Sequence, residues 1–288
     1  MMWFLFAAGT ALFEALKDVT GKQTLKALDE YAVLFGFMTV GALVLLTAVL
    51  ITGGFPSLGP NFGWALLVGG SLNILAFTCY VRAIKIADLS LTVPLVTLTP
   101  LFLLATSPLI VQEWPTWADG VGVILLVVGS YVLNLRSQDQ SFWAPLMAIA
   151  RNQGGRLMLC TAFLWSITSN FDKIGTLNSS PLFWAMSLSA VIAAGMLPFV
   201  MRQGLAGLYA LSAEAKLLGL TGCFNAAGIG LQFAALTLAP VAQVIAVKRT
   251  STLIAVVLGH FLFGEKGLRE RLLGAAIMVT GVAIMALD

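Results

Sequence analysis

Runs of apolar residues follow one another along the whole chain, and short polar or glycine-containing breaks separate them. The runs reach the roughly 17–25 residues that a helix needs to cross the hydrocarbon core of a bilayer. The breaks contain turn-forming sequences such as Thr52-Gly-Gly-Phe-Pro56 and Asn178-Ser-Ser-Pro181. The pattern therefore predicts an all-α integral membrane protein of about ten transmembrane helices. We expect these helices at residues 2–19, 31–52, 63–84, 90–111, 118–135, 157–173, 181–201, 214–236, 241–263 and 271–286.

Composition agrees with this interpretation. Of the 288 residues, 59% are hydrophobic and 10% are charged, whereas a soluble domain is about half apolar and about a quarter charged. The lipid bilayer is therefore the expected solvent. The net charge of +3 is small and spread over several loops, which argues against a nucleic-acid-binding protein. The first apolar run has no preceding basic region and contains Glu14, so we expect a retained helix rather than a signal peptide.

The second part of the chain repeats the first at a constant offset of 152 residues. Apolar residues match by chance, so the matching asparagine, glutamate and glycine residues carry the argument. We expect one repeat at residues 2–135, a connecting loop at 136–156 and a second repeat at 157–287. The matched pairs are Leu12 and Leu164, Gly70 and Gly222, Asn73 and Asn225, Ala83 and Ala235, Ala87 and Ala239, Glu113 and Glu265, Gly122 and Gly274, and Gly129 and Gly281.

Each repeat holds about five helices, an odd number, so the second repeat is expected to enter the membrane in the opposite direction to the first. The loops that carry basic residues change places between the repeats, as this inversion requires. Thirteen basic residues then lie on one face and Lys173 on the other. The positive-inside rule makes the first face cytoplasmic and places both termini outside. The thirteen are Lys17, Lys22, Lys26, Arg82, Lys85, Arg136, Arg151, Arg156, Arg202, Lys216, Lys266, Arg269 and Arg271.

With these features the chain resembles the drug/metabolite transporter superfamily, specifically its EamA-like ten-helix members. In the first repeat the resemblance is carried by Ala83-Ile-Lys-Ile-Ala-Asp-Leu-Ser-Leu-Thr-Val-Pro94, Pro100-Leu-Phe102 and Glu113. In the second repeat it is carried by Lys248-Arg-Thr-Ser-Thr-Leu253, Gly259, Gly264-Glu265, Gly274 and Gly281.

The resemblance covers nearly the whole chain as two EamA-like units of about 135 residues. It implies an inverted-repeat carrier that works by alternating access around a central cavity. It leaves the substrate open, because members move amino acids, sugars, nucleotide sugars, drugs or lipid-linked precursors. Many members have cytoplasmic termini, whereas the charge distribution places both termini outside. The orientation therefore stays open.

Lys248 and Arg249 lie near the middle of the expected ninth helix, where an ionisable residue is costly and is often functional. A guanidinium offers two parallel donors to a carboxylate or phosphate, which makes Arg249 the stronger candidate for binding substrate. Pairing with an acid on another helix, or reaching towards a lipid headgroup, is the structural alternative.

Glu14 is the candidate for proton coupling, since burial raises the pKa of a carboxylate. An ion pair with Lys248 or Arg249, or with Lys17 three residues later, would give it a structural role instead. Asn73 and Asn225 occupy equivalent positions inside helices and can bridge helices or contact substrate. Trp165 can line the cavity or pack.

Several other polar residues and prolines are expected to serve structure. Glu113 and Glu265 precede helices and are expected to cap them. Asn170, Asp172 and Lys173 lie at a helix end and are expected to be solvated or capping. Pro94, Pro100 and Pro108 predict a bend in the fourth helix, a candidate gate, whereas the ninth helix has no matching proline. His260, Gln232 and Gln243 can line the cavity or pack.

No catalytic motif occurs, since the chain lacks HExxH, a Ser/His/Asp set and a glycine-rich phosphate loop, so an enzyme is not expected. Cys79, Cys160 and Cys223 show no metal-binding spacing, and we expect packing, with no metal and no cofactor. We therefore predict a multi-pass transporter of the cell inner membrane that exports a small polar metabolite of the amino acid or organic anion type. A proton-coupled exporter of lipophilic cations, a transporter of a lipid-linked precursor, and a channel are the alternatives.

Overall fold

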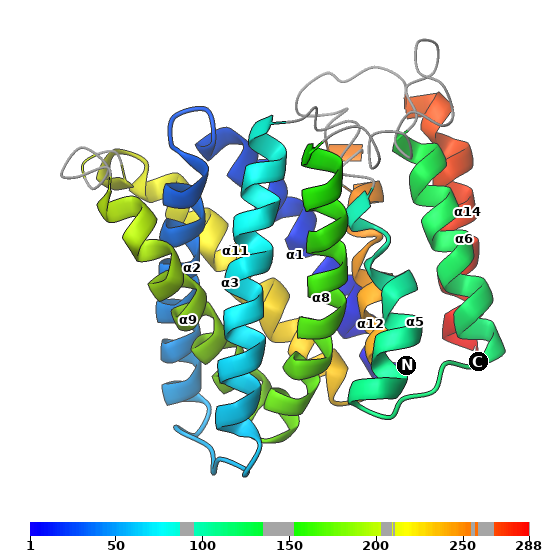
Figure 1. Cartoon of the computed structure of the whole chain (residues 1–288), viewed down its shortest axis with the longest axis horizontal. Coiled ribbons are helices and arrows are strands. Elements are labelled where there is room, and N and C mark those ends of the chain that lie inside the picture. The colour runs from blue at the N-terminus through cyan, green and yellow to red at the C-terminus, as the bar shows by residue number, and fades with distance from the viewer. Residues whose placement is uncertain are drawn as a thin grey trace. The chain divides into compact units, whose positions relative to one another are not determined.

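The computed structural model describes residues 1–86, 95–134, 153–202, 209, 211–254, 257–258 and 268–287. These residues form helices and the turns between them, with no strand in the described ranges, which confirms the predicted all-α fold. Each of the ten predicted spans overlaps a helix. The helices are α1 (Met2–Thr24), α2 (Glu30–Ile51), α3 (Phe62–Ile86), α5 (Thr99–Ile110), α6 (Trp117–Asn134), α8 (Gln153–Leu177), α9 (Pro181–Met201), α11 (Ala215–Leu236), α12 (Val241–Lys248) and α14 (Leu268–Leu287) (Figure 1).

Four helices of the described part are long and apolar enough to cross a membrane, judged by length and composition: Glu30–Ile51, Phe62–Ala83, Pro181–Met201 and Ala215–Leu236. Some helices continue through polar residues at which the apolar pattern predicts an end. In α1, for example, Thr20 and Thr24 donate their hydroxyls to the carbonyls of Leu16 (3.0 Å) and Thr20 (2.9 Å). Because these hydroxyls are satisfied within the helix, α1 runs five residues beyond the predicted end.

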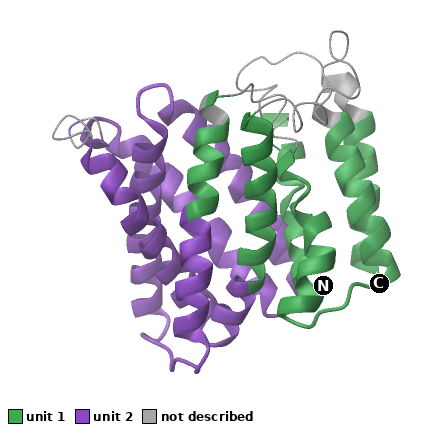
Figure 2. Ribbon diagram, in the orientation of Figure 1, with its two compact units in different colours: residues 1, 75–170, 240–288 green, residues 2–74, 171–239 purple. Residues whose placement is uncertain are grey.

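The chain divides into two compact units, and neither is one of the sequence repeats (Figure 2). Unit 1 contains residues 1, 75–170 and 240–288, and unit 2 contains residues 2–74 and 171–239. Each unit therefore combines helices from both repeats. The boundaries fall inside α3 and α8, so these two helices contribute to both units.

In unit 2, α11 packs against α1, α2 and α9. The buried Thr10 hydroxyl donates to the carbonyl of Gly228, 3.2 Å away, which joins α1 to α11. Gly222 brings α11 against Val40 of α2, since a Cβ at Gly222 would lie 2.6 Å from that side chain. Small residues therefore set the close approach of the helices, as is common in membrane bundles.

In unit 1, α6 and α14 lie side by side (Figure 1). Their contact is made by the four glycines that the sequence repeat pairs. A Cβ at Gly122 would lie 2.7 Å from the carbonyl of Gly281, and a Cβ at Gly129 would lie 2.7 Å from the carbonyl of Gly274. Close backbone contact thus explains the glycines at positions 122, 129 and 281, where a side chain would clash, and Gly274 contributes the carbonyl that Gly129 approaches.

The predicted fourth and ninth helices are both interrupted, at equivalent positions. Thr97 and Leu98 form a turn before α5, and Arg249 and Thr250 form a turn after α12. The expectation of a continuous helix at 241–263 is therefore wrong, although this segment lacks proline. In both turns the backbone hydrogen bonds span three residues instead of four, as in Leu98 N–H to Leu95 O (3.2 Å). Such tightened segments within a helix often mark hinges.

A threonine hydroxyl stabilises each of the two interruptions, and a proline contributes to the first. Pro100 has no N–H to give to the carbonyl of Val96, and the Thr99 hydroxyl donates to that oxygen instead, at 2.6 Å. In the second repeat, Thr250 donates its hydroxyl to Val247 O, 2.7 Å away. The proline therefore accounts for one interruption, and back-bonded threonine accompanies both.

Candidate functional site

Arg249 connects the two helix interruptions within unit 1. It follows the last residue of α12, and its Nη2 donates to the hydroxyl of Thr99, the first residue of α5, at 3.0 Å. The two residues belong to different repeats, and Arg249 is half-buried. The guanidinium is therefore held at the point where both predicted spans lose their regular helical hydrogen bonding.

Aromatic side chains form a wall beside this guanidinium. The Arg249 Cζ lies 5.6 Å from the centroid of the Trp165 ring, a cation–π contact from α8. The Trp165 ring in turn contacts Tyr80 and Phe77 of α3, with centroids 5.4 and 5.5 Å apart. Two of the residues singled out from the sequence, Arg249 and Trp165, are thus in direct contact.

The electrostatics of this cluster favour a negative ligand group. The Arg249 guanidinium is positive, and the N-terminus of α5, which begins at Thr99, carries the positive end of the helix dipole. Lys248 is half-buried in the last turn of α12 and adds a second cation on the neighbouring residue. A carboxylate or phosphate at this point would meet a guanidinium and the positive end of a helix dipole. We call Arg249, Thr99, Trp165 and Tyr80 the arginine cluster.

The two asparagines named from the sequence lie in unit 2. Asn225 is buried, and its Nδ2 faces Met38 Sδ of α2 at 3.9 Å, close to Gly41. This contact bridges α11 and α2. Asn73 is 5% exposed, and its Nδ2 makes no hydrogen bond with any residue that the structure describes. A substrate role for either asparagine remains a prediction.

Glu14 forms an ion pair along its own helix. Its Oε1 lies 2.7 Å from Lys17 Nζ, and both side chains are less than one-fifth exposed. This is the pairing of residues three apart that the sequence offered as one of three alternatives. Proton coupling through Glu14 stays a prediction.

Two carboxylates, one between α5 and α6 and one in the first turn of α6, hold the start of α12. Glu113 Oε2 accepts the N–H of Val241 at 2.8 Å, and Asp119 Oδ1 accepts Gln243 Nε2 at 2.8 Å. The expectation that Glu113 caps the helix that follows it is wrong, because it caps α12 from far along the sequence. Asp119 was not singled out, although the Thr116-to-Asp119 pairing of hydroxyl and carboxylate is a recognisable helix-start signal.

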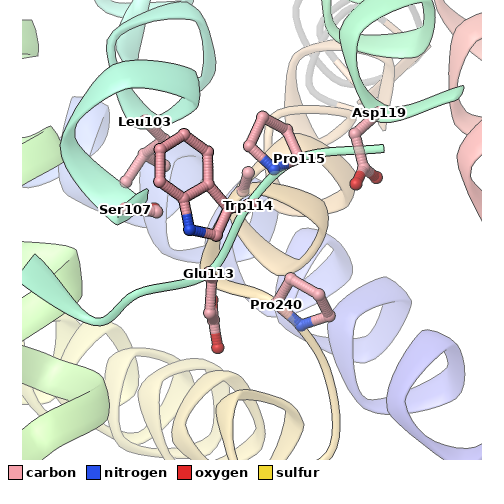
Figure 3. A pocket seen from close by; sticks show the side chains of 8 residues that line it. Leu103, Ser107, Glu113, Trp114, Pro115, Asp119 and Pro240 are labelled. Carbon is pink, nitrogen blue, oxygen red and sulfur yellow. The ribbon is translucent and has the colours of Figure 1, made fainter. Parts of the chain in front are cut away.

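A small cavity of about 10 Å³ lies at this corner (Figure 3). Glu113 and Asp119 lie on either side of Pro240, the residue before α12 (Figure 3). Ser107 also lines the cavity and is 2% exposed, and its hydroxyl has no partner among the described residues. The space suffices for about one water molecule and has no room for a metabolite. The corner therefore serves to hold α12 in place.

The end of α8 differs from the sequence-based expectation. Asn170 and Asp172 are buried rather than solvated, because α8 continues to Leu177 and the neighbouring helices cover them. Asp172 accepts the indole N–H of the fully buried Trp184 at 3.2 Å. Lys173 behaves as a capping residue, since its Nζ donates to the carbonyl of Ala239 at 2.9 Å.

Unit 2 contains a larger cavity of about 810 Å³. Its lining comes from α1, the α2–α3 loop, the start of α9 and α11, and it includes no charged side chain. Glycine and alanine at positions 226, 227, 230 and 234 leave the space open on the α11 side. The cavity is suited to an apolar ligand.

Glu265, His260 and Pro94 lie outside the described residues.

A family model for the EamA-like transporter family matches residues 1–135 and 153–287. The chain belongs to the EamA-like transporter family. The match therefore supports a membrane transporter of the drug/metabolite type, a class of non-enzymatic carriers. It supports a multi-pass membrane protein as well.

The fold of this EamA-like transporter resembles that of a solved structure. One solved crystal structure, described only as that of a protein, superposes with a TM-score of 0.72 at 16% sequence identity. The superposition covers 99% of this chain and 97% of that one. At this identity the likeness shows the fold alone. No curated protein matches the chain.

Proposed function

We propose that this EamA-like transporter carries a small metabolite with a carboxylate or other anionic group, and that the arginine cluster binds that group. The observation that carries the proposal is the hydrogen bond between Arg249 and Thr99, with Trp165 over the guanidinium. It places a fixed cation beside a helix N-terminus at two helix interruptions. Carriers with inverted repeats often bind substrate where helices are discontinuous.

Each residue of the cluster has a distinct role in this proposal. The Arg249 guanidinium pairs with the anionic group and fixes its orientation. Thr99 holds the guanidinium in place, and the Trp165 ring limits its movement and shields the charge from water. Asn73, Asn225 and Lys248 are proposed as further polar contacts for the substrate. The interruptions act as hinges during alternating access, and the carrier works as an exporter in the cell inner membrane.

The test measures thermal unfolding of the detergent-purified protein with a panel of amino acids, organic acids, sugar phosphates, nucleotides and cationic drugs. A ligand present at about 100 times its dissociation constant adds about 2.7 kcal/mol to the stability of the folded state. We expect an anionic or zwitterionic compound to raise the unfolding temperature of the wild type but not of Arg249→Ala. Arg249→Lys should keep only part of the shift, because an ammonium cannot donate two parallel hydrogen bonds.

Arg202→Ala is the matched control for this experiment. Arg202 also lies over an aromatic ring, with its Cζ 5.8 Å from the centroid of Phe199, but it is exposed and belongs to unit 2. The ligand-induced shift should therefore survive in Arg202→Ala. Equal shifts in the wild type and in Arg249→Ala would contradict the assignment of the site.

The apolar cavity of unit 2 favours a second candidate function, the export of a lipophilic cation or a lipid-linked precursor. The cavity has a volume of about 810 Å³, and no charged side chain lines it. Phe13, which lines the cavity, precedes Glu14 in the sequence. In this case Glu14 would exchange a proton for the substrate. A shift caused only by lipophilic cations, unchanged in Arg249→Ala and lost in Glu14→Gln, would favour this function over the first.

A further inference from the structure

The cavity of about 810 Å³ in unit 2 is a groove bordered by faces of two helices. Its lining residues on α1 are Phe6 and Phe13, which lie two turns apart on one face of that helix. On α11 the lining residues recur at the spacing of a single helix face. They are Ala226, Ala227, Gly230, Leu231 and Ala234.

The two helices run in opposite directions along the groove. Leu231 lies beside Gly9, since a Cβ at Gly9 would be 2.9 Å from its side chain. The rings of Phe224 and Phe13 lie beside each other, with centroids 6.2 Å apart. Residue numbers therefore rise along α1 where they fall along α11, and the first turns of α1 lie beside the last turns of α11.

The groove is about as long as one leaflet of a bilayer is thick. Ala226 and Ala234 are eight residues apart, which corresponds to about 12 Å along α11. The hydrocarbon core of a bilayer is about 30 Å thick, so one leaflet contributes about 15 Å. Ala234 lies close to the end of α11 at Leu236, and Phe6 lies close to the start of α1 at Met2. The groove thus begins at a helix end and extends inwards by about one leaflet.

The polarity of the lining matches the two parts of a lipid. The residues from the α2–α3 loop and the start of α9 include two with hydroxyl groups, Thr52 and Ser180. Backbone amides of the turn at Gly53 and Gly54 lie there as well. The lining residues of α1 and α11, in contrast, have no polar side chain. A molecule with a polar end and a long apolar tail fits this change of polarity.

Exposed apolar side chains continue the groove towards the surroundings of the helices. Leu5 and Leu12 precede Phe6 and Phe13 on α1, and they are 67% and 45% exposed. Phe55, which lines the groove, is 63% exposed. In a multi-pass membrane protein, lipid tails are the solvent for such side chains, and they are as apolar as leucine. Water does not fill space that only apolar groups line.

We propose that one acyl chain of a membrane phospholipid occupies this groove as a resident ligand. The ester end of the lipid lies at Thr52 and Ser180, and its chain extends between α1 and α11. The chain fills the space that alanine and glycine leave open on α11. The groove selects for the chain and not for the charge of the headgroup, because no charged side chain lines it. The inference goes beyond the proposed function, since this lipid stays bound and is not carried.

The experiment titrates a photoactivatable phosphatidylcholine, with a diazirine in one acyl chain, into the delipidated full-length protein in detergent. After illumination, labelled peptides are quantified by mass spectrometry. A chain in a defined groove gives labelling that saturates, whereas lipid that merely surrounds the helices labels in proportion to its amount. We expect saturable labelling of the peptides that contain Phe13 and Ala227, and removal of this label by unlabelled phosphatidylcholine. A phosphatidylglycerol probe with the same chains should label them equally.

Ala227→Leu places a larger side chain in the groove and should abolish the saturable labelling. Cys223→Leu is the matched control, because Cys223 is exposed one turn away on α11 and does not line the groove. It should label as the wild type does. Ala234→Leu fills the groove nearer the helix end and tests the same point if Ala227→Leu does not fold. Thermal unfolding establishes that each variant is folded.

Two further measurements separate this proposal from the proposed functions. Arg249→Ala should keep the saturable label, because the arginine cluster belongs to unit 1. Tetraphenylphosphonium is the second competitor. If it removes the label and unlabelled phosphatidylcholine does not, the groove binds a lipophilic cation and the acyl-chain proposal is wrong. Labelling that never saturates, or equal saturation in the folded Ala227→Leu variant and the wild type, would also overturn it.

Discussion

The backbone N–H of Val241 donates to Glu113 Oε2 over 2.8 Å, although 128 residues separate the two in the sequence. Val241 is the first residue of α12, whose N-cap position is Pro240 and has no side-chain hydrogen bond to offer. The carboxylate therefore replaces the missing cap. It also meets the positive end of the α12 dipole. One residue of the first repeat thus fixes the start of the helix that leads to Arg249.

Glu113→Ala should destabilise the protein by about 1–3 kcal/mol, since it leaves the Val241 N–H without its acceptor. Glu113→Gln keeps an acceptor oxygen and should lose less. The measurement is unfolding by denaturant in detergent. Glu214→Ala is the control, because Glu214 occupies the N-cap position of α11 without a side-chain cap hydrogen bond. A loss of the same size in Glu214→Ala would show that the capping bond is not the cause.

The partner of Glu113 illustrates what sequence spacing can and cannot predict. The position of a carboxylate next to a helix boundary correctly predicted a capping role. Local spacing favoured the nearest helix, however, and the true partner lies in the other repeat. Contacts between distant segments depend on how the helices pack, which the apolar pattern of a single segment does not encode.

The same limit applies to the helix interruptions and to the buried polar residues. Pro100 predicted a bend in the fourth helix, whereas the turn at Arg249 has no proline and depends on hydroxyls that bond to the backbone. Apolar patterning also ended the sixth helix at Lys173, and so Asp172 was expected to be solvated or capping. Neighbouring helices cover it instead. The repeat and the membrane class were predictable, because they follow from periodicities along the chain itself.

Trp184→Phe tests the buried carboxylate. The substitution keeps an aromatic ring against Gly175 but removes the N–H that Asp172 accepts at 3.2 Å. We expect a loss of about 1–3 kcal/mol, because a buried acceptor loses a donor. Trp64→Phe changes an exposed tryptophan and should cost about 0.5 kcal/mol or less. Similar unfolding curves for the two variants would mean that the indole hydrogen bond contributes little.

Gly129→Ala tests the close contact between α6 and α14. A Cβ at this position would lie 2.6 Å from Met278 N and 2.7 Å from Gly274 O, and backbone atoms cannot move aside as a flexible side chain can. We expect destabilisation of about 1–3 kcal/mol. Gly120→Ala on the same helix meets nothing within 4 Å and should stabilise α6 by up to about 1 kcal/mol. Thermal unfolding of both variants should therefore shift in opposite directions.

In the proposed site, Thr99 links the stability of the fourth span to the binding of substrate, and two substitutions separate its roles. Its hydroxyl donates to Val96 O and accepts from Arg249, at 2.6 and 3.0 Å. Thr99→Val removes both bonds at nearly constant shape, whereas Thr99→Ser retains the hydroxyl. We expect Thr99→Val to lose about 1 kcal/mol of stability and to weaken the binding of the anionic ligand about tenfold, because the guanidinium is no longer held in place.

Thr47→Val is the control for Thr99→Val. Thr47 donates to Leu43 O at 3.0 Å in the same back-bonded manner, but it is exposed and has no contact with an arginine cluster residue in the described structure. Titration of the ligand identified by thermal unfolding should give wild-type affinity for Thr47→Val and for Thr99→Ser. If Thr99→Val also binds with wild-type affinity, Thr99 serves the helix interruption alone, and the Arg249 guanidinium is positioned by its contact with Trp165.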